Sequence, residues 1–400
     1  MKKNTFFPPF DTTEPHLKNL PKITPQIRKL LEFLSIPEEE WNFVLGIETK
    51  EVPEKYAHIQ KNLEERGLKI EYLNDPSTDR RLFIKKAGIF SLFKDEEDPI
   101  IKKHIKKSYG GLYIRLPQNL KLKDEFLYLP SLLKFSYAPF PHTYIEFQEN
   151  SEGNIALGTP APRLINSPYY LSTVEIIVKE NAKANVSLIH SFPDYLDARI
   201  YTRIYLDEGA SLTLSLLNFK NGKITCRDVK GNLEKNSNLT LNTLSFGTED
   251  GKYYEWIEIA QKGEQSNVLV NTRQVSMDTS SSNSFVKIKA KEGAKNSKAY
   301  IDSKGIVLSR NAEQFSLPAF ETQENMVQMS HSAYIGQIEE QSSIYLASRG
   351  LSDRDIVYLM VKSYLEEALL NSLPEKFYET MLKFLEYLLS TREIEIIKHT

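Results

Sequence analysis

The clearest pattern in the chain is a series of short strand-like segments between about residues 109 and 335. Val, Ile, Leu, Thr and Tyr alternate there with polar residues, and Gly, Asn and Asp separate the segments. Matching positions of a repeated turn-then-strand unit lie 28, 27, 28 and 29 residues apart, at Ala182, Ala210, Ser237, Gln265 and Ala294. A steady period of this length, with strands in each unit, predicts the stacked coils of a β-solenoid.

A β-sandwich is the alternative fold for such a chain. Its short strands also recur, but at a spacing of roughly 8–12 residues and without a matching small residue in each repeat. The longer period therefore favours the solenoid.

Helical patterns flank this region. Ser35 and Glu38 form the ends of a capping box, and Tyr56, Ile59 and Leu63 recur at helical steps before Gly67, which supplies a left-handed C′ position. We therefore expect three parts, a helical and mixed region over 1–108, a parallel β-helix core over 109–335 and a helical region over 336–400.

The C-terminal region has a wide apolar helix face. Ser352 to Asp355 predicts a helix start, Pro374 ends the helix, and a second helix follows with Phe377, Met381, Phe384 and Leu388 at four-residue steps. The first helix places Ile356, Met360 and Tyr364 on one side, with Val357, Val361 and Leu365 beside them. Such a face packs on the solenoid, caps its end or binds a partner.

Composition and charge exclude several classes of partner. Among 400 residues, 51 Lys and Arg nearly balance 53 Asp and Glu, so the overall charge gives no reason to expect nucleic acid or an anionic membrane as a partner. No stretch approaches the roughly 18 consecutive apolar residues of a membrane helix. The basic N-terminus lacks an apolar signal region, so we expect a cytoplasmic protein.

Few residues point to chemistry. The chain has no P-loop and no Gly-x-Gly-x-x-Gly before a helix, and its seven histidines are scattered. The single cysteine, Cys226, excludes a disulfide within the chain, a Cys-based zinc site and a cluster held by the chain's own thiolates. Lys223 and Arg227 could lower its pKa, but a lone thiol is more often a small buried hydrophobe, so Cys226 is a weak candidate.

A sugar-active enzyme is the alternative function, because many β-helix proteins are polysaccharide lyases or glycosidases. Such enzymes gather carboxylates or basic residues on one concave face. Stacking of coils could bring Glu175, Glu208, Glu255 and Glu258 together, although we interpret them as solvated turn carboxylates.

The segment from Met329 to Glu340, followed by Ile344 to Ser352, resembles the signature of the SufB/SufD family. That pattern has a His, a small residue and Ala, then Ile or Val with Gly, Glu-Glu, an aromatic-Leu pair and Ser-Arg-Gly-Leu/Ile-Ser. Weaker similarity extends to residues 36–49, 158–162, 172–178, 305–312 and 317–321. The resemblance implies a right-handed parallel β-helix flanked by helical segments, and a non-catalytic scaffold subunit of iron–sulfur cluster assembly.

The resemblance also implies partners. Family members pair through their β-helices, with a SufB-like subunit or an identical copy, and dock the ABC-type ATPase SufC through C-terminal helices. The matching positions here are about 337–370, so the predicted docking residues are Ile356, Met360, Tyr364 and Leu365. No cofactor is expected to reside in the chain, and an iron–sulfur cluster would be bound only transiently in the assembled complex.

One departure from the SufB pattern and one match to the SufD pattern decide the candidate site. SufB carries a cysteine before Asp-Ser, whereas Ile301 precedes Asp302 and Ser303 here. SufD proteins contribute a histidine at the position matching His331, which is therefore the candidate cluster-assembly residue. From the residues alone, His331 is either a ligand or a structural side chain at the end of the core. The chain resembles SufD in this role, and an inactive SufB paralogue is the other reading.

Overall fold

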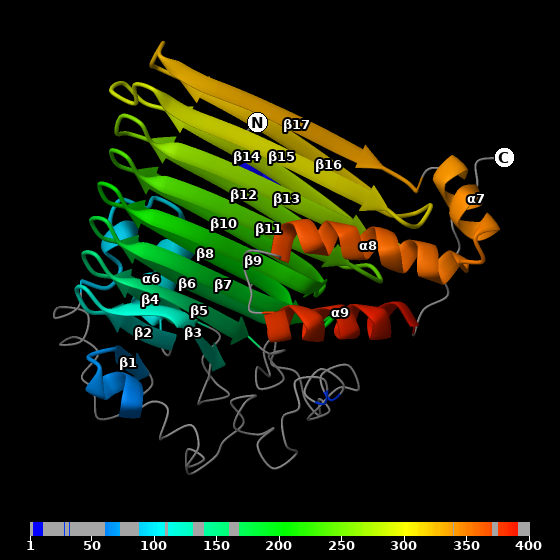
Figure 1. Ribbon diagram of the computed structural model, residues 1–400, viewed down its shortest axis with the longest axis horizontal. Helices are drawn as coiled ribbons and strands as arrows, with labels where there is room; N and C mark the ends of the chain where they lie inside the picture. Colours follow the sequence, from blue (N-terminus) through cyan, green and yellow to red (C-terminus); the bar gives the residue numbers. More distant parts are fainter. Residues whose placement is uncertain are drawn as a thin grey trace.

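Two parallel sheets, joined coil by coil, form the body of the protein in the computed structural model (Figure 1). The structure describes residues 3–10, 28, 32, 61–72, 88–108, 111–130, 140–159, 168–338, 340–369 and 375–390. From β2 onward, successive strands alternate between the sheets, so every coil contributes one strand to each. The prediction of a parallel β-solenoid is confirmed.

Within the described residues, sheet A has nine strands and sheet B has eight. In order across sheet A, they are β1 (Lys69–Tyr72), β2 (Gly111–Leu116), β4 (His142–Phe147), β6 (Tyr169–Val178), β8 (Asp197–Leu206), β10 (Ile224–Leu233), β12 (Lys252–Gln261), β14 (Ser281–Ala290) and β16 (Glu313–Thr322). Sheet B runs through β3 (Lys121–Pro130), β5 (Glu152–Thr159), β7 (Lys183–Phe192), β9 (Ser211–Asn221), β11 (Asn238–Gly247), β13 (Asn267–Ser276), β15 (Ser297–Val307) and β17 (Val327–Gly336). Among the described strands, only β1 pairs antiparallel, with β2.

A column of small, fully buried residues marks one corner of the coils. Strand register aligns Ser151, Ala182, Ala210, Ser237, Ser266 and Ser297, each with 0% exposure. Two positions predicted from the period were wrong. Gln265 is the left-handed turn residue just before Ser266. Ala294 lies in a turn that adds residues before the aligned Ser297, so the period lengthens there.

The interior of the solenoid has an apolar half and a polar half. Val229 and Ile257 of sheet A meet Leu241 and Val270 of sheet B in the largest hydrophobic cluster. Because side chains alternate across a strand, Arg227 and Thr243, two residues along from these apolar positions, also face the interior. The result is a buried polar layer inside the coils.

C-terminal helices follow the solenoid. They are α7 (Glu340–Ser348), α8 (Asp353–Leu369) and α9 (Glu375–Ser390). Helices α8 and α9 cover the outer face of sheet B, whereas α7 lies beyond the strand ends (Figure 1). Ile356, Val357 and Val361 of α8 pack against outward-facing Leu217 and Phe246. The predicted cap is confirmed, since the Ser352 hydroxyl accepts from the Asp355 amide at 3.2 Å and the Asp355 carboxylate accepts from the Ser352 amide at 3.0 Å.

N-terminal segments cover the outer face of sheet A. They are α1 (Lys3–Phe6), the short helix η2 (Ser91–Phe93) and α6 (Pro99–Lys107). Residues 61–65 are helical and Gly67 has a left-handed φ of 88°, as predicted, whereas the Ser35 capping box lies outside the described residues. None of the helices described is long and apolar enough to cross a membrane.

Candidate functional site

His331 lies in β17, at the end of the solenoid where no described strand follows (Figure 1). It stands opposite Ile301 in the strand register, and Ile301 faces the core. The His331 side chain therefore has the inward orientation of a core position, yet it is exposed because no coil covers it. Its ring lies 5.5 Å from that of Phe320 in β16. An imidazole in this place is open to a molecule that approaches the end of the solenoid.

Asp302 is the buried carboxylate nearest to His331 in the strand register. It accepts from the neighbouring Ser332 hydroxyl at 2.5 Å and from Arg273 Nη2 at 2.6 Å. Burial raises the pKa of Asp302, but the Ser332 hydrogen bond and the Arg273 guanidinium outweigh it, so the pKa lies below its usual value. The carboxylate stays ionised and fixes Ser332, which positions the strand that carries His331.

A second polar group, which sequence reasoning missed, lies inside the coils. Arg227 donates to Tyr253 Oη at 3.3 Å and to His190 Nδ1 at 3.2 Å. Tyr253 and Thr243 donate to the two oxygens of Glu255 at 2.7 and 2.8 Å. Burial, opposed by Arg227, raises the pKa of Glu255, and burial together with Arg227 lowers the pKa of His190 well below its usual value. Arg227 of β10 and Glu255 of β12 are partners in the strand register. The signal that could have placed them inside is the alternation of side chains, because both lie two residues before a core position of the same strand.

Cys226 lies on the outer face of sheet A and is buried, with 2% exposure. Arg199 Nη1 donates to its Sγ at 2.7 Å. Burial raises the pKa of the Cys226 thiol well above its usual value, and this outweighs the opposing effect of Arg199. The thiol is therefore protonated in this state and is not close in register to His331.

The predicted docking residues lie mainly on the packed side of α8. Ile356 has 0% exposure in the cluster against sheet B, and Met360 and Tyr364 pack partly against the same cluster. The side chain of Leu365 lies outside the described residues. Their docking role stays a prediction, and the exposed apolar side chains nearby are Ile344, Tyr345 and Leu359.

The four carboxylates weighed for sugar chemistry do not share a face. Glu175 and Glu255 are fully buried on strands, and Glu258 lies on β12, where it accepts from Trp256 Nε1 at 2.9 Å, so the interpretation as solvated turn residues is wrong for all three. Glu175 faces outward and accepts from the amides of Phe90 and Leu92, whereas Glu255 faces inward. Glu208 is exposed at a turn. Across the described ranges, no three His, Cys, Asp or Glu side chains are placed to hold a metal ion.

Comparison with known proteins gives a match over most of the β-helix and the start of the C-terminal helices. A family model described as SUF system FeS cluster assembly, SufBD core domain, matches residues 135–364, which run from before β4 into α8.

Curated relatives extend the match toward both ends of the chain. An iron-sulfur cluster assembly SufBD family protein of Pyrococcus horikoshii is 27% identical over 375 residues, which are 94% of this chain and 83% of that protein. A protein of the same description from Archaeoglobus fulgidus is 25% identical over 75% of this chain and 80% of its own length. One from Staphylococcus aureus is 21% identical over 86% of this chain and 74% of its own length.

Proposed function

Since the chain belongs to the SufBD family of iron–sulfur cluster assembly proteins, we propose that it is a non-catalytic scaffold subunit of a SUF-type assembly complex. In this proposal it pairs with a SufB-like subunit, or with a second copy of itself, through the open end of the β-helix. It docks a SufC-type ATPase through its C-terminal helices. The observation that carries the proposal is the uncovered last coil, in which the inward-facing His331 is exposed at the end of the solenoid.

The edge strand β17 supports pairing at this end. Its sequence, Val-Gln-Met-Ser-His-Ser-Ala-Tyr-Ile-Gly, contains no Lys, Arg, Asp, Glu or Pro, the residues that usually protect an exposed sheet edge from other strands. The neighbouring edge strand β16 does contain Pro318 between Glu313 and Glu321. Tyr334 and Ile335 are 52% and 39% exposed. An unprotected edge with exposed apolar side chains is suited to a partner strand.

The exposed side of the C-terminal helices supports a separate docking surface. Ile344 and Tyr345 of α7 are 61% and 56% exposed, and Leu359 of α8 is 42% exposed. The opposite side of α8 is already used against sheet B. We therefore assign ATPase docking to the exposed side rather than to Ile356.

In the assembled complex, His331 would supply one ligand to a nascent cluster. Since Cys226 is buried elsewhere on sheet A, further thiolate or carboxylate ligands would come from the paired subunit or from solution. The cluster is cargo of the complex and not a resident cofactor of this chain.

Two surface substitutions test the two contacts separately. The chain is co-purified with a SufB-like and a SufC-type protein, and each affinity is then measured alone. Tyr334→Lys should weaken β-helix pairing at least about tenfold and leave ATPase binding unchanged. Tyr345→Lys should do the reverse, so each variant is the matched control of the other. If both contacts survive both substitutions, the assigned surfaces are wrong.

His331→Ala tests the site itself. It should keep both contacts but reduce the iron–sulfur absorption that develops on anaerobic reconstitution of the full complex. Gln328→Ala, an exposed residue of the same strand, is the control and should reconstitute normally. Equal absorption from the two variants would return His331 to a structural role.

A further inference from the structure

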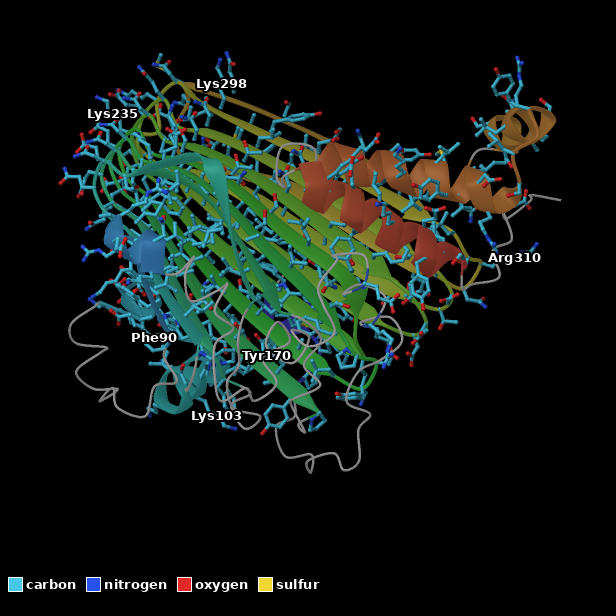
Figure 2. All side chains as sticks on the ribbon, turned by 60° about the horizontal axis from the view of Figure 1, so that its bottom comes forward. Phe90, Lys103, Tyr170, Lys235, Lys298 and Arg310 are labelled. Carbon is cyan, nitrogen blue, oxygen red and sulfur yellow. The ribbon has the colours of Figure 1, made fainter. Side chains whose placement is uncertain are left out.

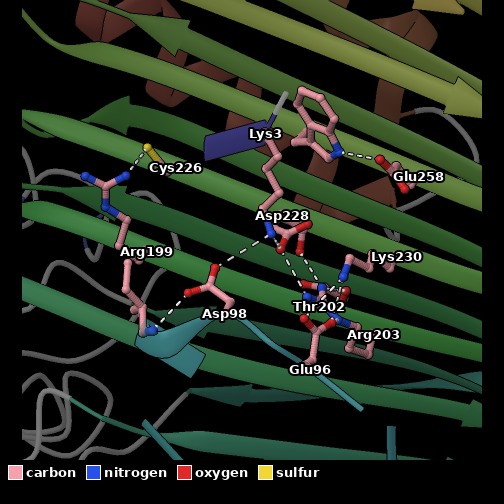
Figure 3. A network of polar contacts seen from close by, with 12 residues as sticks. Lys3, Glu96, Asp98, Arg199, Thr202, Arg203, Cys226, Asp228, Lys230 and Glu258 are labelled. Atoms are coloured by element: carbon pink, nitrogen blue, oxygen red, sulfur yellow. Dashed lines mark hydrogen bonds and ion pairs between the residues drawn. The ribbon is translucent and has the colours of Figure 1, made fainter. Parts of the chain in front are cut away.

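Residues 3–10 cross the outer face of sheet A, and we call them the N-terminal strap. Lys3 pairs with Asp228 of β10, as Figure 3 shows. The Phe6 ring packs against Trp256 of β12 at 5.5 Å between centroids, and Phe6 is only 6% exposed. The Pro9 carbonyl accepts from Arg199 Nη2 at 3.1 Å. The strap is further held by a second ion pair of Lys3, to Asp98 at 3.9 Å, and by the Phe10 ring, which lies 5.0 Å from the Arg199 guanidinium.

The strap lies over the only thiol of the chain. Arg199 joins the two directly, because its Nη2 donates to Pro9 of the strap while its Nη1 donates to Cys226 Sγ. Phe6 also contacts Tyr254, the residue that stands opposite Cys226 in the next strand. Release of residues 3–10 would therefore open the surface around Cys226 to solvent.

The surface beneath the strap does not need it for charge pairing. Asp228 keeps a hydrogen bond from Arg203 Nη2 at 3.0 Å, and Arg199 keeps its ion pair with Asp197 at 2.9 Å. Trp256 keeps its stacked neighbour Phe285 and its hydrogen bond to Glu258. Since the charges retain partners, strap release avoids the large penalty of an unpaired buried charge.

The strap also borders an open cavity. A cavity of about 770 Å³ separates residues 7–10 from residues 95–100, above Arg199, Tyr201 and Lys230. This cavity is open to solvent, so one side of the strap borders water rather than the packed core.

We propose that the N-terminal strap is a detachable intramolecular ligand of sheet A that gates access to Cys226. Burial of the Phe6 side chain alone favours the closed state by roughly 10- to 100-fold, and the contacts of Lys3, Pro9 and Phe10 add to this preference. The open state is therefore a minor one that a mutation or a competing segment can populate.

Thiol labelling measures the gate, because Cys226 is the only cysteine and gives no background. The full chain is treated with a thiol reagent under native conditions. Phe6→Ala should label about tenfold faster or more than the unmodified chain. Phe315→Ala removes a ring of the same kind from an exposed position on β16 and should label at the original rate. Urea midpoints of the same variants separate strap release from global unfolding.

Rescue in trans decides whether the strap is a ligand. A chain that lacks residues 2–10 should label fast, and a synthetic peptide of residues 1–10 should restore slow labelling in a saturable way. The same peptide with Phe6→Ala should not. The proposal is overturned if Phe6→Ala labels no faster than the unmodified chain, or if the intact peptide fails to protect the shortened chain.

Discussion

Arg203 lies at the centre of the charged cluster on sheet A, and Arg203→Met tests how that cluster contributes to stability (Figure 3). The guanidinium is nearly buried and donates from Nε to Glu96 at 2.6 Å, from Nη2 to Asp228 at 3.0 Å and from Nη1 to the Thr202 carbonyl at 3.0 Å. Methionine keeps much of the volume but removes every one of these donors. Two carboxylates would then lose their main partner.

The expected loss is about 3 kcal/mol near pH 7. Removing one partner of a buried ion pair costs about 3–5 kcal/mol, and the lower end applies because Lys3 still reaches Asp228 and Lys230 still reaches Glu96. For both carboxyls, burial raises the pKa but Arg203 and the lysines outweigh it, so both folded-state pKa values lie below the usual ones.

The pH dependence has a definite sign. A carboxyl with a lowered folded-state pKa contributes stability above its unfolded pKa of about 4, and this contribution is lost as the pH falls through the folded-state value. Arg203→Met raises both folded-state pKa values. The difference in unfolding free energy between the two chains should therefore be largest near pH 7 and shrink toward about pH 4.

Urea unfolding followed by far-ultraviolet circular dichroism, at about pH 7 and about pH 4.5, measures both effects. Arg310→Met is the control, since Arg310 is exposed at the turn between β15 and β16 (Figure 2) and should change stability by less than about 0.5 kcal/mol. A loss below about 1 kcal/mol, or a loss that does not change with pH, would refute the reasoning.

Two further predictions concern packing. Ile356→Ala should lower the free energy of unfolding by about 2–5 kcal/mol, because Ile356 is fully buried between α8 and sheet B. Leu359→Ala, at a 42% exposed position of the same helix, should lower it far less, and urea midpoints compare the two variants. Ala210→Leu should lower the free energy of unfolding by about 1–3 kcal/mol, since a larger side chain does not fit the fully buried corner column. Ser211→Leu, at the adjacent and partly exposed position, is the control in the same urea assay.

Local signals in the sequence predicted much of the fold. The steady period gave the solenoid because every coil has to place a small residue at the same buried corner, as Ala182, Ala210 and Ser237 do. The cap at Ser352 was predictable because it depends on a contact only three residues away. The same period failed at Ala294, where a turn is longer and only the strand register identifies Ser297 as the aligned residue.

Properties that depend on distant segments were not predictable in this way. Glu175 was predicted to be a solvated turn residue. In the structure its carboxylate is buried and accepts hydrogen bonds from the amides of Phe90 and Leu92, which lie more than 80 residues earlier in the chain. The apolar face of α8 gave no sign of whether sheet B or a partner covers it, because either would select the same side chains. The N-terminal strap was missed for the same reason. Phe6 is buried by Trp256 and Tyr254, and nothing near Phe6 in the sequence indicates that these distant residues contact it.

The coverings of the two sheets determine where partners can bind. Sheet B is covered on its outer face by α8 and α9, and sheet A by the strap, η2 and α6, whereas β16 and β17 are edge strands to which a partner strand could add without displacing these elements. Strap release instead exposes the middle of sheet A, around Cys226 in β10 and Trp256 in β12. The strap's nearest approach to the open end is the cluster of Phe6, Trp256 and Phe285, with Ala319 of β16 packed against it. Coupling between pairing and thiol access would therefore have to pass through β14 and β16, and substitutions at Tyr334 and Phe6 perturb the two surfaces from opposite ends of that path.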